Sequence, residues 1–146
     1  MSIKQSIKDT LKQVFGYNEF RPNQEKIIEA IIENKDVLAV LPTGSGKSLC
    51  YQLPALIKSG ITIVISPLIA LMEDQVIQLN KLGIRSASLN SSLDINERSY
   101  IENHLKEYDI LYISPERINM PECLQLLDGV PVSSIVIDEA HCISQW

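Results

Sequence analysis

The strongest chemical signal in the sequence is a glycine-rich segment that ends in a lysine and a serine. An apolar run, Leu38–Leu41, is followed by Pro42, Thr43, Gly44, Ser45, Gly46, Lys47 and Ser48. Gly44 and Gly46 permit backbone angles that let successive N–H groups point at one anion. Lys47 would supply a positive charge for β- and γ-phosphates, and Ser48 a hydroxyl for Mg²⁺. We therefore predict a nucleotide phosphate site at Thr43–Ser48, with Lys47 also acting in catalysis.

This segment departs from the strict phosphate-loop pattern at one position, because Leu41 stands where the pattern has its first glycine. A glycine-rich turn beside a surface lysine is therefore an alternative interpretation. The segment lies between a strand-like run, Val37–Leu41, and a helical pattern over residues 47–58. That placement favours the phosphate site, because a helix N-terminus adds free amides and a favourable dipole for an anion.

A second chemical signal follows the apolar run Ile135–Ile137, where Asp138, Glu139, Ala140 and His141 come in succession. An acidic pair at the carboxyl end of a buried strand lies where open α/β sheets bind ligands. Asp138 can hold Mg²⁺ through water, and Glu139 can polarise an attacking water molecule. The alternative is a solvated acidic loop. We assign catalysis to Lys47, Asp138 and Glu139, and the metal to Ser48 and Asp138.

Apolar runs and helical patterns alternate along the chain, which predicts a doubly wound α/β fold. The predicted strands are Val37–Leu41, Ile61–Ile65, Ser86–Leu89, Ile110–Ile113 and Ser134–Ile137. Except for the short third run, they are continuous rather than alternating, as in parallel strands that are buried on both faces. Helices are predicted over 3–14, Pro22–Asn34, 47–58, 68–82, 96–107 and 121–127. The sheet is expected to be mostly parallel, with helices on both faces.

Composition and charge set limits on the function. The chain has 146 residues, which is about the length of one domain, and its net charge is −5. A protein that binds nucleic acid through bulk charge is usually basic, so any such contact must be local. The three cysteines show no zinc-ligand spacing and no disulfide framework. The sequence shows no signal peptide and no membrane span, so we expect a protein that is not secreted and does not contact a membrane.

Five segments in the same order resemble the motifs of the RecQ family of DNA helicases, within superfamily 2. Asp138–His141 resembles its DEAH-type Walker B box, and the extension to Trp146 is typical of RecQ proteins. Phe15–Gln24 is similar to motif 0, Ile65–Val76 to motif Ia, and Leu111–Arg117 to motif Ib. Together with the phosphate loop these segments reach from Phe15 to Trp146.

The resemblance implies that residues 1–146 are the N-terminal part of a first RecA-like motor domain, with a helical motif 0 region at residues 1–35. It implies 3′-to-5′ unwinding of single-stranded and forked DNA, driven by ATP with Mg²⁺, in recombination and repair. It places the arginine finger in a second RecA-like domain. We expect the chain to be truncated after the Walker B strand, and the protein to be cytoplasmic and nucleoid-associated in bacteria, or nuclear in eukaryotes.

In motif 0, the carboxamide of Gln24 has the donor and acceptor that suit the N6/N7 edge of adenine. Tyr17 offers a face for stacking and Arg21 a cation, so these three residues are assigned to the nucleotide. As alternatives, Tyr17 could be a core aromatic residue and Gln24 part of a solvated helix face.

The predicted DNA contacts come from loops that follow strands. Ser66 and Ser114 each precede a proline, and their hydroxyls and free amides could hold phosphate without net charge. The proline could equally do no more than end the strand. We add Asn90, Arg117 and Trp146 to the predicted DNA contacts, and assign His141 and Gln145 to coupling with a neighbouring domain. Other functions to test are a nucleotide-binding module without turnover and an RNA-directed DEAH-type motor.

Overall fold

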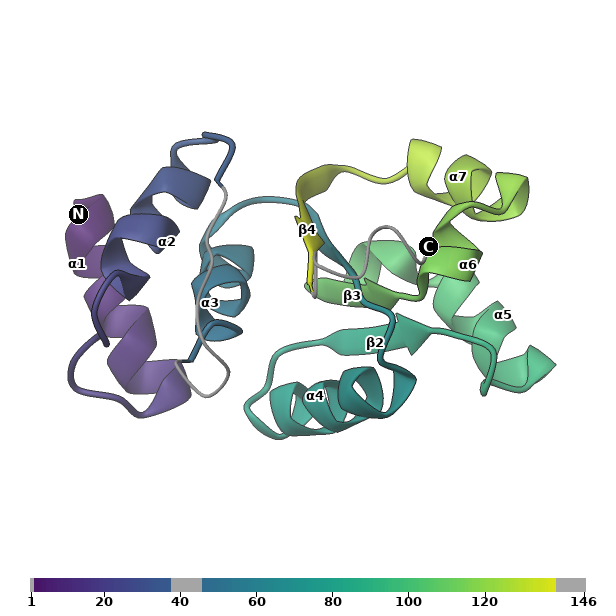
Figure 1. Cartoon of the computed structure of the whole chain (residues 1–146), viewed down its shortest axis with the longest axis horizontal. Helices are drawn as coiled ribbons and strands as arrows, with labels where there is room; N and C mark the ends of the chain where they lie inside the picture. The colour runs from purple at the N-terminus through teal and green to yellow at the C-terminus, as the bar shows by residue number, and fades with distance from the viewer. Residues whose placement is uncertain (1, 38–45, 139–146) are drawn as a thin grey trace. The chain divides into compact units, whose positions relative to one another are not determined.

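Apolar runs between residues 61 and 137 form the strands of a parallel sheet (Figure 1). The computed structural model describes residues 2–37 and 46–138. It divides the chain into two units, Met1–Ser59 and Gly60–Trp146. The predicted strand Val37–Leu41 falls almost entirely on residues outside the described ranges.

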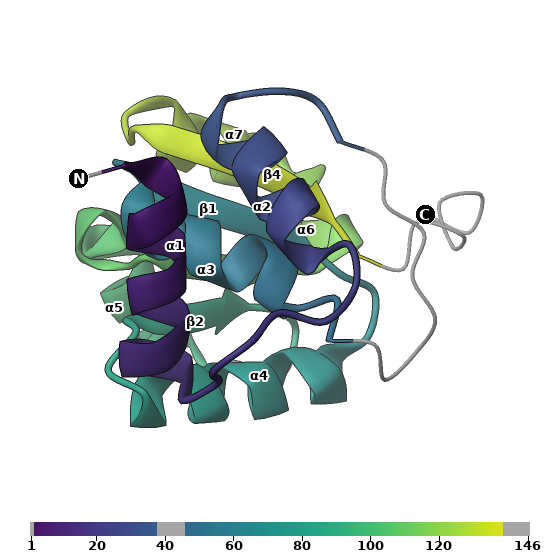
Figure 2. The same ribbon diagram turned by 90° about the vertical axis from the view of Figure 1, so that its left-hand side faces the viewer.

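Among the described residues of the first unit, three α-helices lie against one another (Figure 2). A small apolar core fills the space between them. The helices are α1 (Ile3–Thr10), α2 (Gln24–Ile32) and α3 (Leu49–Ile57). Ile7, Leu11, Ile28, Leu49 and Leu53 meet between them. The predicted helix over residues 3–14 is α-helical only to Thr10 and continues as a π-helical turn, Leu11–Phe15. The predicted start of α2 at Pro22 is two residues early, because Asn23 adopts a left-handed conformation with φ 72°.

In the second unit, the described residues form a four-stranded sheet in the order β2–β3–β1–β4, with all pairs parallel. The strands are β1 (Ile61–Ile65), β2 (Ser86–Leu89), β3 (Ile110–Ile113) and β4 (Val132–Ile137). The connecting helices are α4 (Ile69–Lys81), α5 (Ile95–Asn103), α6 (Pro115–Ile118) and α7 (Pro121–Asp128), with a 3₁₀ turn at Leu105–Glu107. The short helix α6 was not predicted.

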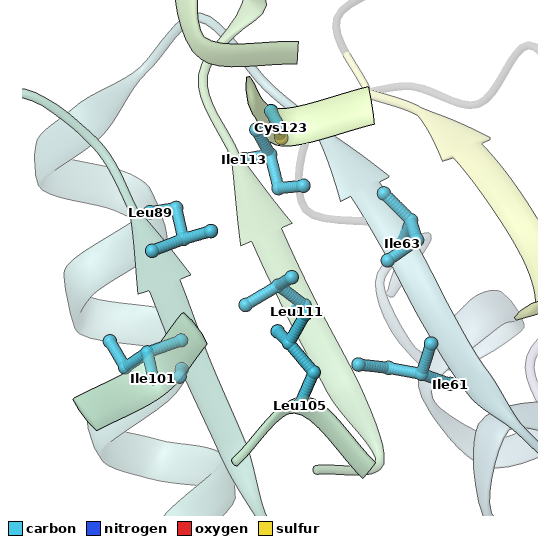
Figure 3. Packing of buried hydrophobic residues seen from close by; sticks show 9 residues of the cluster. Ile61, Ile63, Leu89, Ile101, Leu105, Leu111, Ile113 and Cys123 are labelled. Atoms are coloured by element: carbon cyan, nitrogen blue, oxygen red, sulfur yellow. The ribbon is translucent and has the colours of Figure 1, made fainter. Parts of the chain in front are cut away.

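One face of this sheet carries the main core of the second unit. Side chains from β1, β2 and β3 meet residues from α5, the 3₁₀ turn and α7 (Figure 3). The cluster consists of Ile61, Ile63, Ala87, Leu89, Ile101, Leu105, Leu111, Ile113 and Cys123. Tyr112 points to the opposite face, where its hydroxyl donates a hydrogen bond of 3.0 Å to Gln75 in α4. Helices therefore cover both faces, as predicted.

The burial expected for the last strand is wrong. Ile135 and Ile137 share a face with Ile63 and Ile65 through the β1–β4 register, yet Ile135 is 67% exposed. Within the described residues, β4 has β1 as its neighbour on one side and lies at the end of the strand order. The helices that bury β1, β2 and β3 leave it uncovered. A continuous apolar run thus predicted the strand correctly but not its burial.

Gly60 allows β1 and β4 to begin side by side. Its φ is +101°, and a Cβ built there would lie 2.7 Å from the carbonyl oxygen of Pro131. That same oxygen accepts a hydrogen bond from the Ile61 N–H at 2.9 Å, so it cannot move without loss of the bond. A side chain at this position therefore meets both backbone strain and a steric clash.

We expect Gly60→Ala to lower the free energy of unfolding by about 2 kcal/mol or more, because strain and clash add. Gly83→Ala is the matched control. Gly83 also has a positive φ, +85°, but nothing lies within 4 Å of its added Cβ. Urea unfolding of both variants checks the prediction. An equal loss of stability in the two would show that the approach to Pro131 contributes nothing.

Candidate functional site

The described end of the phosphate loop leads directly into α3. Gly46 has φ +77°, and Lys47 and Ser48 are half-buried immediately before the first helical residue, Leu49. The carbonyl of Gly46 accepts from the Leu49 N–H at 3.3 Å, and the carbonyl of Lys47 accepts from the Cys50 N–H at 3.1 Å. These bonds tie the loop end to the predicted helix, which begins at Leu49, two residues after the predicted start. Thr43, Gly44 and Ser45 lie outside the described residues.

Motif 0 lies against this loop end within the first unit. The Gln24 side-chain oxygen accepts from the Arg21 N–H at 2.8 Å, and its Nε2 donates to the carbonyl of Gly46 at 2.9 Å. A Cβ on Gly46 would lie 2.5 Å from that Nε2 and 3.7 Å from an Arg21 guanidinium nitrogen. The structure thus brings three predicted nucleotide residues together: Arg21, Gln24 and Gly46.

Two alternative interpretations of motif 0 are wrong. Gln24 is 3% exposed and is therefore not part of a solvated helix face. Tyr17 is 57% exposed and is therefore not a core aromatic residue. Tyr17 follows the π-helical turn, and its N–H donates to the Leu11 carbonyl at 3.2 Å. Its exposed ring is consistent with the stacking role, which stays a prediction.

In the second unit, polar residues follow the four described strands in a row along the carboxyl edge. Asn90 comes after β2, Ser114 after β3, Ser66 after β1 and Asp138 after β4. Backbone bonds extend the sheet through this row: Ser114 N–H to Leu89, Ser66 N–H to Ile113, and Asp138 N–H to Ile65, at 3.2, 3.1 and 2.9 Å. The prediction that Ser66 and Ser114 share one edge of the sheet is confirmed.

The expectation that the amides of Ser66 and Ser114 are free for DNA phosphate is wrong, because the sheet uses both. Ser66, Asn90 and Ser114 are also buried, so their side chains face the protein rather than solvent. The Asn90 side-chain oxygen accepts from the Ser92 N–H at 2.8 Å, and Ser66 Oγ accepts from the Leu68 N–H at 3.4 Å. In this conformation they hold the loops that follow the strands.

Arg117 lies in α6, and its N–H donates to the Ser114 carbonyl at 3.0 Å. Its guanidinium contacts the sulfur of Met120 at 3.5 Å. It is therefore placed beside one of the buried serines, and its DNA contact stays a prediction. Glu139, His141, Gln145 and Trp146 lie outside the described residues, so their predicted roles rest on the sequence.

The donor set fits magnesium by its chemistry. Ser48 and Asp138 offer a hydroxyl and a carboxylate, and Mg²⁺ takes oxygen ligands while keeping several waters and substrate phosphates. Residues 2–37 and 46–138 contain no cluster of three or more His, Cys, Asp or Glu side chains that could hold a metal. Ser48 and Asp138 lie in different units of the chain, and their joint assignment to magnesium stays a prediction.

Cys50 follows the loop end but is not a reactive thiol. Burial raises the pKa of its thiol from the ordinary 9.0 to about 11, against a smaller opposing effect of a backbone hydrogen bond. Burial likewise raises the pKa of Cys123. Both are free cysteines with buried side chains. Because the thiolate is the nucleophile, neither cysteine suits catalysis near neutral pH.

The raised pKa of Cys50 makes stability depend on pH. The unfolded chain loses this proton near pH 9 and the folded chain near pH 11. This contribution is therefore fully present below pH 9 and lost as the pH rises through 11. We expect unfolding free energy to fall more steeply over this window in the natural chain than in Cys50→Ala, measured by urea unfolding. If the unfolding free energy of the two proteins changed equally with pH over this window, the prediction would be contradicted.

Comparison with known proteins identifies the family. The family model described as DEAD/DEAH box helicase matches residues 21–146. The chain belongs to the DEAD/DEAH box helicase family. None of the described helices is long and apolar enough to cross a membrane.

The resemblance to RecQ proteins is also confirmed. The chain is 50% identical to the probable ATP-dependent DNA helicase RecS of Bacillus subtilis, over 96% of this chain and 28% of that protein. It is 49% identical to the ATP-dependent DNA helicase RecQ of Pasteurella multocida, over 99% of this chain and 23% of that protein. The chain therefore spans about a quarter of the length of these relatives.

A solved structure supports the fold. A hypothetical ATP-dependent RNA helicase from Sulfolobus tokodaii superposes with a TM-score of 0.74 at 21% identity, covering 97% of this chain and 43% of that one. At this level of identity the likeness shows the fold alone. With the parallel sheet and its helices, it confirms the predicted α/β, RecA-like architecture.

Sequence reasoning did not find the contact between Gln24 and Gly46. The two residues are 22 positions apart, and a single sequence contains no signal that pairs them. It also did not find the cluster in which Ser92 Oγ lies 2.5 Å from a carboxylate oxygen of Glu73 and 2.5 Å from the side-chain oxygen of Asn90, either of which can accept its single hydrogen. Tertiary packing brings these groups together, and residue type alone does not determine it.

Proposed function

We propose that this chain is the nucleotide-binding part of an ATP-dependent DNA helicase of the RecQ type, which unwinds DNA in the 3′-to-5′ direction in recombination and repair. The observation that carries the proposal is identity of about 50% to RecS and RecQ along nearly the whole chain. The placement of Lys47 and Ser48 at the start of α3, and of Asp138 at the end of β4, supports it.

In the proposed mechanism, Lys47 offsets the charge on the β- and γ-phosphates, and the amides of the loop hold the phosphate oxygens. Ser48 and Asp138 would hold Mg²⁺, which supplies further charge neutralisation when bound with ATP. Glu139 polarises the attacking water. Tyr17, Arg21 and Gln24 are assigned to the base side of the nucleotide. His141 and Gln145 would couple nucleotide state to a second RecA-like domain.

We propose that single-stranded and forked DNA bind at the carboxyl edge of the sheet. The buried residues Ser66, Asn90 and Ser114 would act there by holding the loops after β1, β2 and β3 in place. Arg117 and Trp146 would contact DNA directly. Since the chain carries a net charge of −5, we expect residues 1–146 to bind DNA weakly by themselves. A protein with this function works where the DNA is, in the bacterial cytoplasm or the eukaryotic nucleus.

The test is phosphate release from ATP by the complete gene product that contains these residues, with single-stranded DNA, with RNA of the same sequence, and with neither. We expect DNA to raise the rate and RNA to leave it near the unstimulated level. Stimulation by RNA alone would support an RNA-directed motor instead. No stimulated release with either nucleic acid would support a nucleotide-binding module without turnover.

A further inference from the structure

The Gln24 carboxamide forms hydrogen bonds with two backbone groups in the first unit. Its oxygen accepts from the Arg21 N–H at 2.8 Å, and its nitrogen donates to the Gly46 carbonyl at 2.9 Å. With 3% of the residue exposed, its side chain leaves almost no surface for a ligand. A bidentate contact with adenine needs this same carboxamide as donor and acceptor. In this conformation Gln24 therefore holds the protein rather than a base.

The hydrogen bond from Gln24 to the Gly46 carbonyl involves the Gly46–Lys47 peptide group, which belongs to the predicted phosphate site. The described residues contain no cis peptide bond, so the C=O of Gly46 and the N–H of Lys47 point in opposite directions from one plane. Because the Gly46 carbonyl is directed at Gln24, the Lys47 N–H is directed away from it. The Leu49 N–H also donates to this carbonyl, at 3.3 Å. The peptide plane is thus held by both α2 and α3.

We infer that Gln24 is a positioning residue for the phosphate loop: it fixes the Gly46–Lys47 peptide so that the Lys47 amide is already oriented for a phosphate oxygen. This rests on the proposed nucleotide site and extends it. Gln24 then assists the binding of a triphosphate whether or not a base is attached. A residue that only reads adenine assists ATP and has no effect on a ligand without a base.

The test compares Mg²⁺–tripolyphosphate, which has no base, with Mg²⁺–ATP by calorimetry on the 146-residue chain. We expect Gln24→Ala to weaken tripolyphosphate binding roughly 3- to 10-fold, the effect of one hydrogen bond, and ATP binding at least as much. Asn80→Ala is the matched control. Its carboxamide also bridges a backbone N–H and a carbonyl, both of Ser86, at 3.0 and 3.1 Å. We expect it to leave both affinities unchanged.

Unchanged tripolyphosphate affinity in Gln24→Ala, with weakened ATP binding, would overturn the inference and leave the proposed function standing. Failure of the natural chain to bind either ligand would overturn the proposed function and the inference with it. If Gln24→Ala does not fold, Gln24→Met keeps the length and bulk of the side chain without its polar groups, and the same tripolyphosphate comparison decides.

A double-mutant cycle tests the contact itself. An added Cβ on Gly46 would lie 2.5 Å from the Gln24 nitrogen, so shortening Gln24 removes that conflict. We expect Gly46→Ala to lower the free energy of unfolding less in the Gln24→Ala background than in the natural chain. Additive effects of the two changes would show that the side chain of Gln24 does not lie against Gly46, and would overturn the inference.

Discussion

Replacing Lys47 by alanine is expected to weaken Mg²⁺–ATP binding about 100-fold or more. Hydrogen bonds from a charged donor are each worth about 1.5–3 kcal/mol, and a phosphate-loop lysine reaches two phosphates. Lys47 is half-buried next to the start of α3, where the helix dipole also favours an anion. Its loss removes the positive charge that sequence and structure both place at this loop end. Isothermal titration calorimetry measures the effect directly.

The control for this variant is Lys35→Ala, in the same unit. Lys35 forms a surface ion pair with Glu33 at 3.0 Å, with 67% of the Lys35 side chain and 46% of the Glu33 side chain exposed. Lys35→Ala removes one positive charge, as Lys47→Ala does, but leaves the loop intact, so we expect the affinity for ATP to change by less than about two-fold. Equal ATP affinity in the natural chain and Lys47→Ala would rule out the phosphate site.

ATP hydrolysis by residues 1–146 alone is expected to be about 10³- to 10⁵-fold slower than DNA-stimulated hydrolysis by the complete gene product. Phosphoryl transfer spreads charge over the γ-phosphate oxygens, and an arginine finger contributes an effect of this size. The resemblance to RecQ helicases places that arginine in the second motor domain. Closure of two domains around ATP also gates such reactions. Steady-state phosphate release, with and without single-stranded DNA, measures both rates.

Fast, DNA-stimulated hydrolysis by residues 1–146 would contradict this prediction and place a catalytic arginine within them. Arg21 would be the first candidate. One of its guanidinium nitrogens lies 3.7 Å from where a Cβ on Gly46 would stand. Arg117 is a weaker candidate, because its guanidinium already contacts the sulfur of Met120. Arg21→Ala would then abolish the unexpected activity, whereas Arg117→Ala would not.

Strand positions were predicted well because each strand is a short apolar run that the parallel sheet needs. Ile61–Ile65 and Ile110–Ile113 match β1 and β3 to the residue, and even the ambiguous run Ser86–Leu89 is β2. Helix ends were harder to predict, because they depend on local backbone geometry. The left-handed Asn23 delays α2, and the π-helical turn at Leu11–Phe15 replaces the end of the first predicted helix.

For the site residues, the sequence left a different property unpredicted. Residue types indicated which groups could bind a nucleotide, and the structure places Arg21, Gln24 and Gly46 together. The types did not show that hydrogen bonds already engage these groups. The Gln24 carboxamide and the amides of Ser66 and Ser114 all have backbone partners, which only the fold reveals. The exposure of Ile135 likewise depends on which elements cover β4, and this is decided by tertiary structure rather than by the local sequence.

The measurement that tests the central claim most directly is ATP-dependent unwinding of a duplex with a 3′ single-stranded tail by the complete gene product. The natural protein is expected to separate the strands only with ATP and Mg²⁺, and to fail on a duplex with a 5′ tail. Glu139→Gln is expected to bind ATP with unchanged affinity and to unwind nothing, because the attacking water is no longer polarised. Unwinding by Glu139→Gln at the natural rate, or no ATP-dependent unwinding by the natural protein, would contradict the assignment of this chain to a DNA helicase motor.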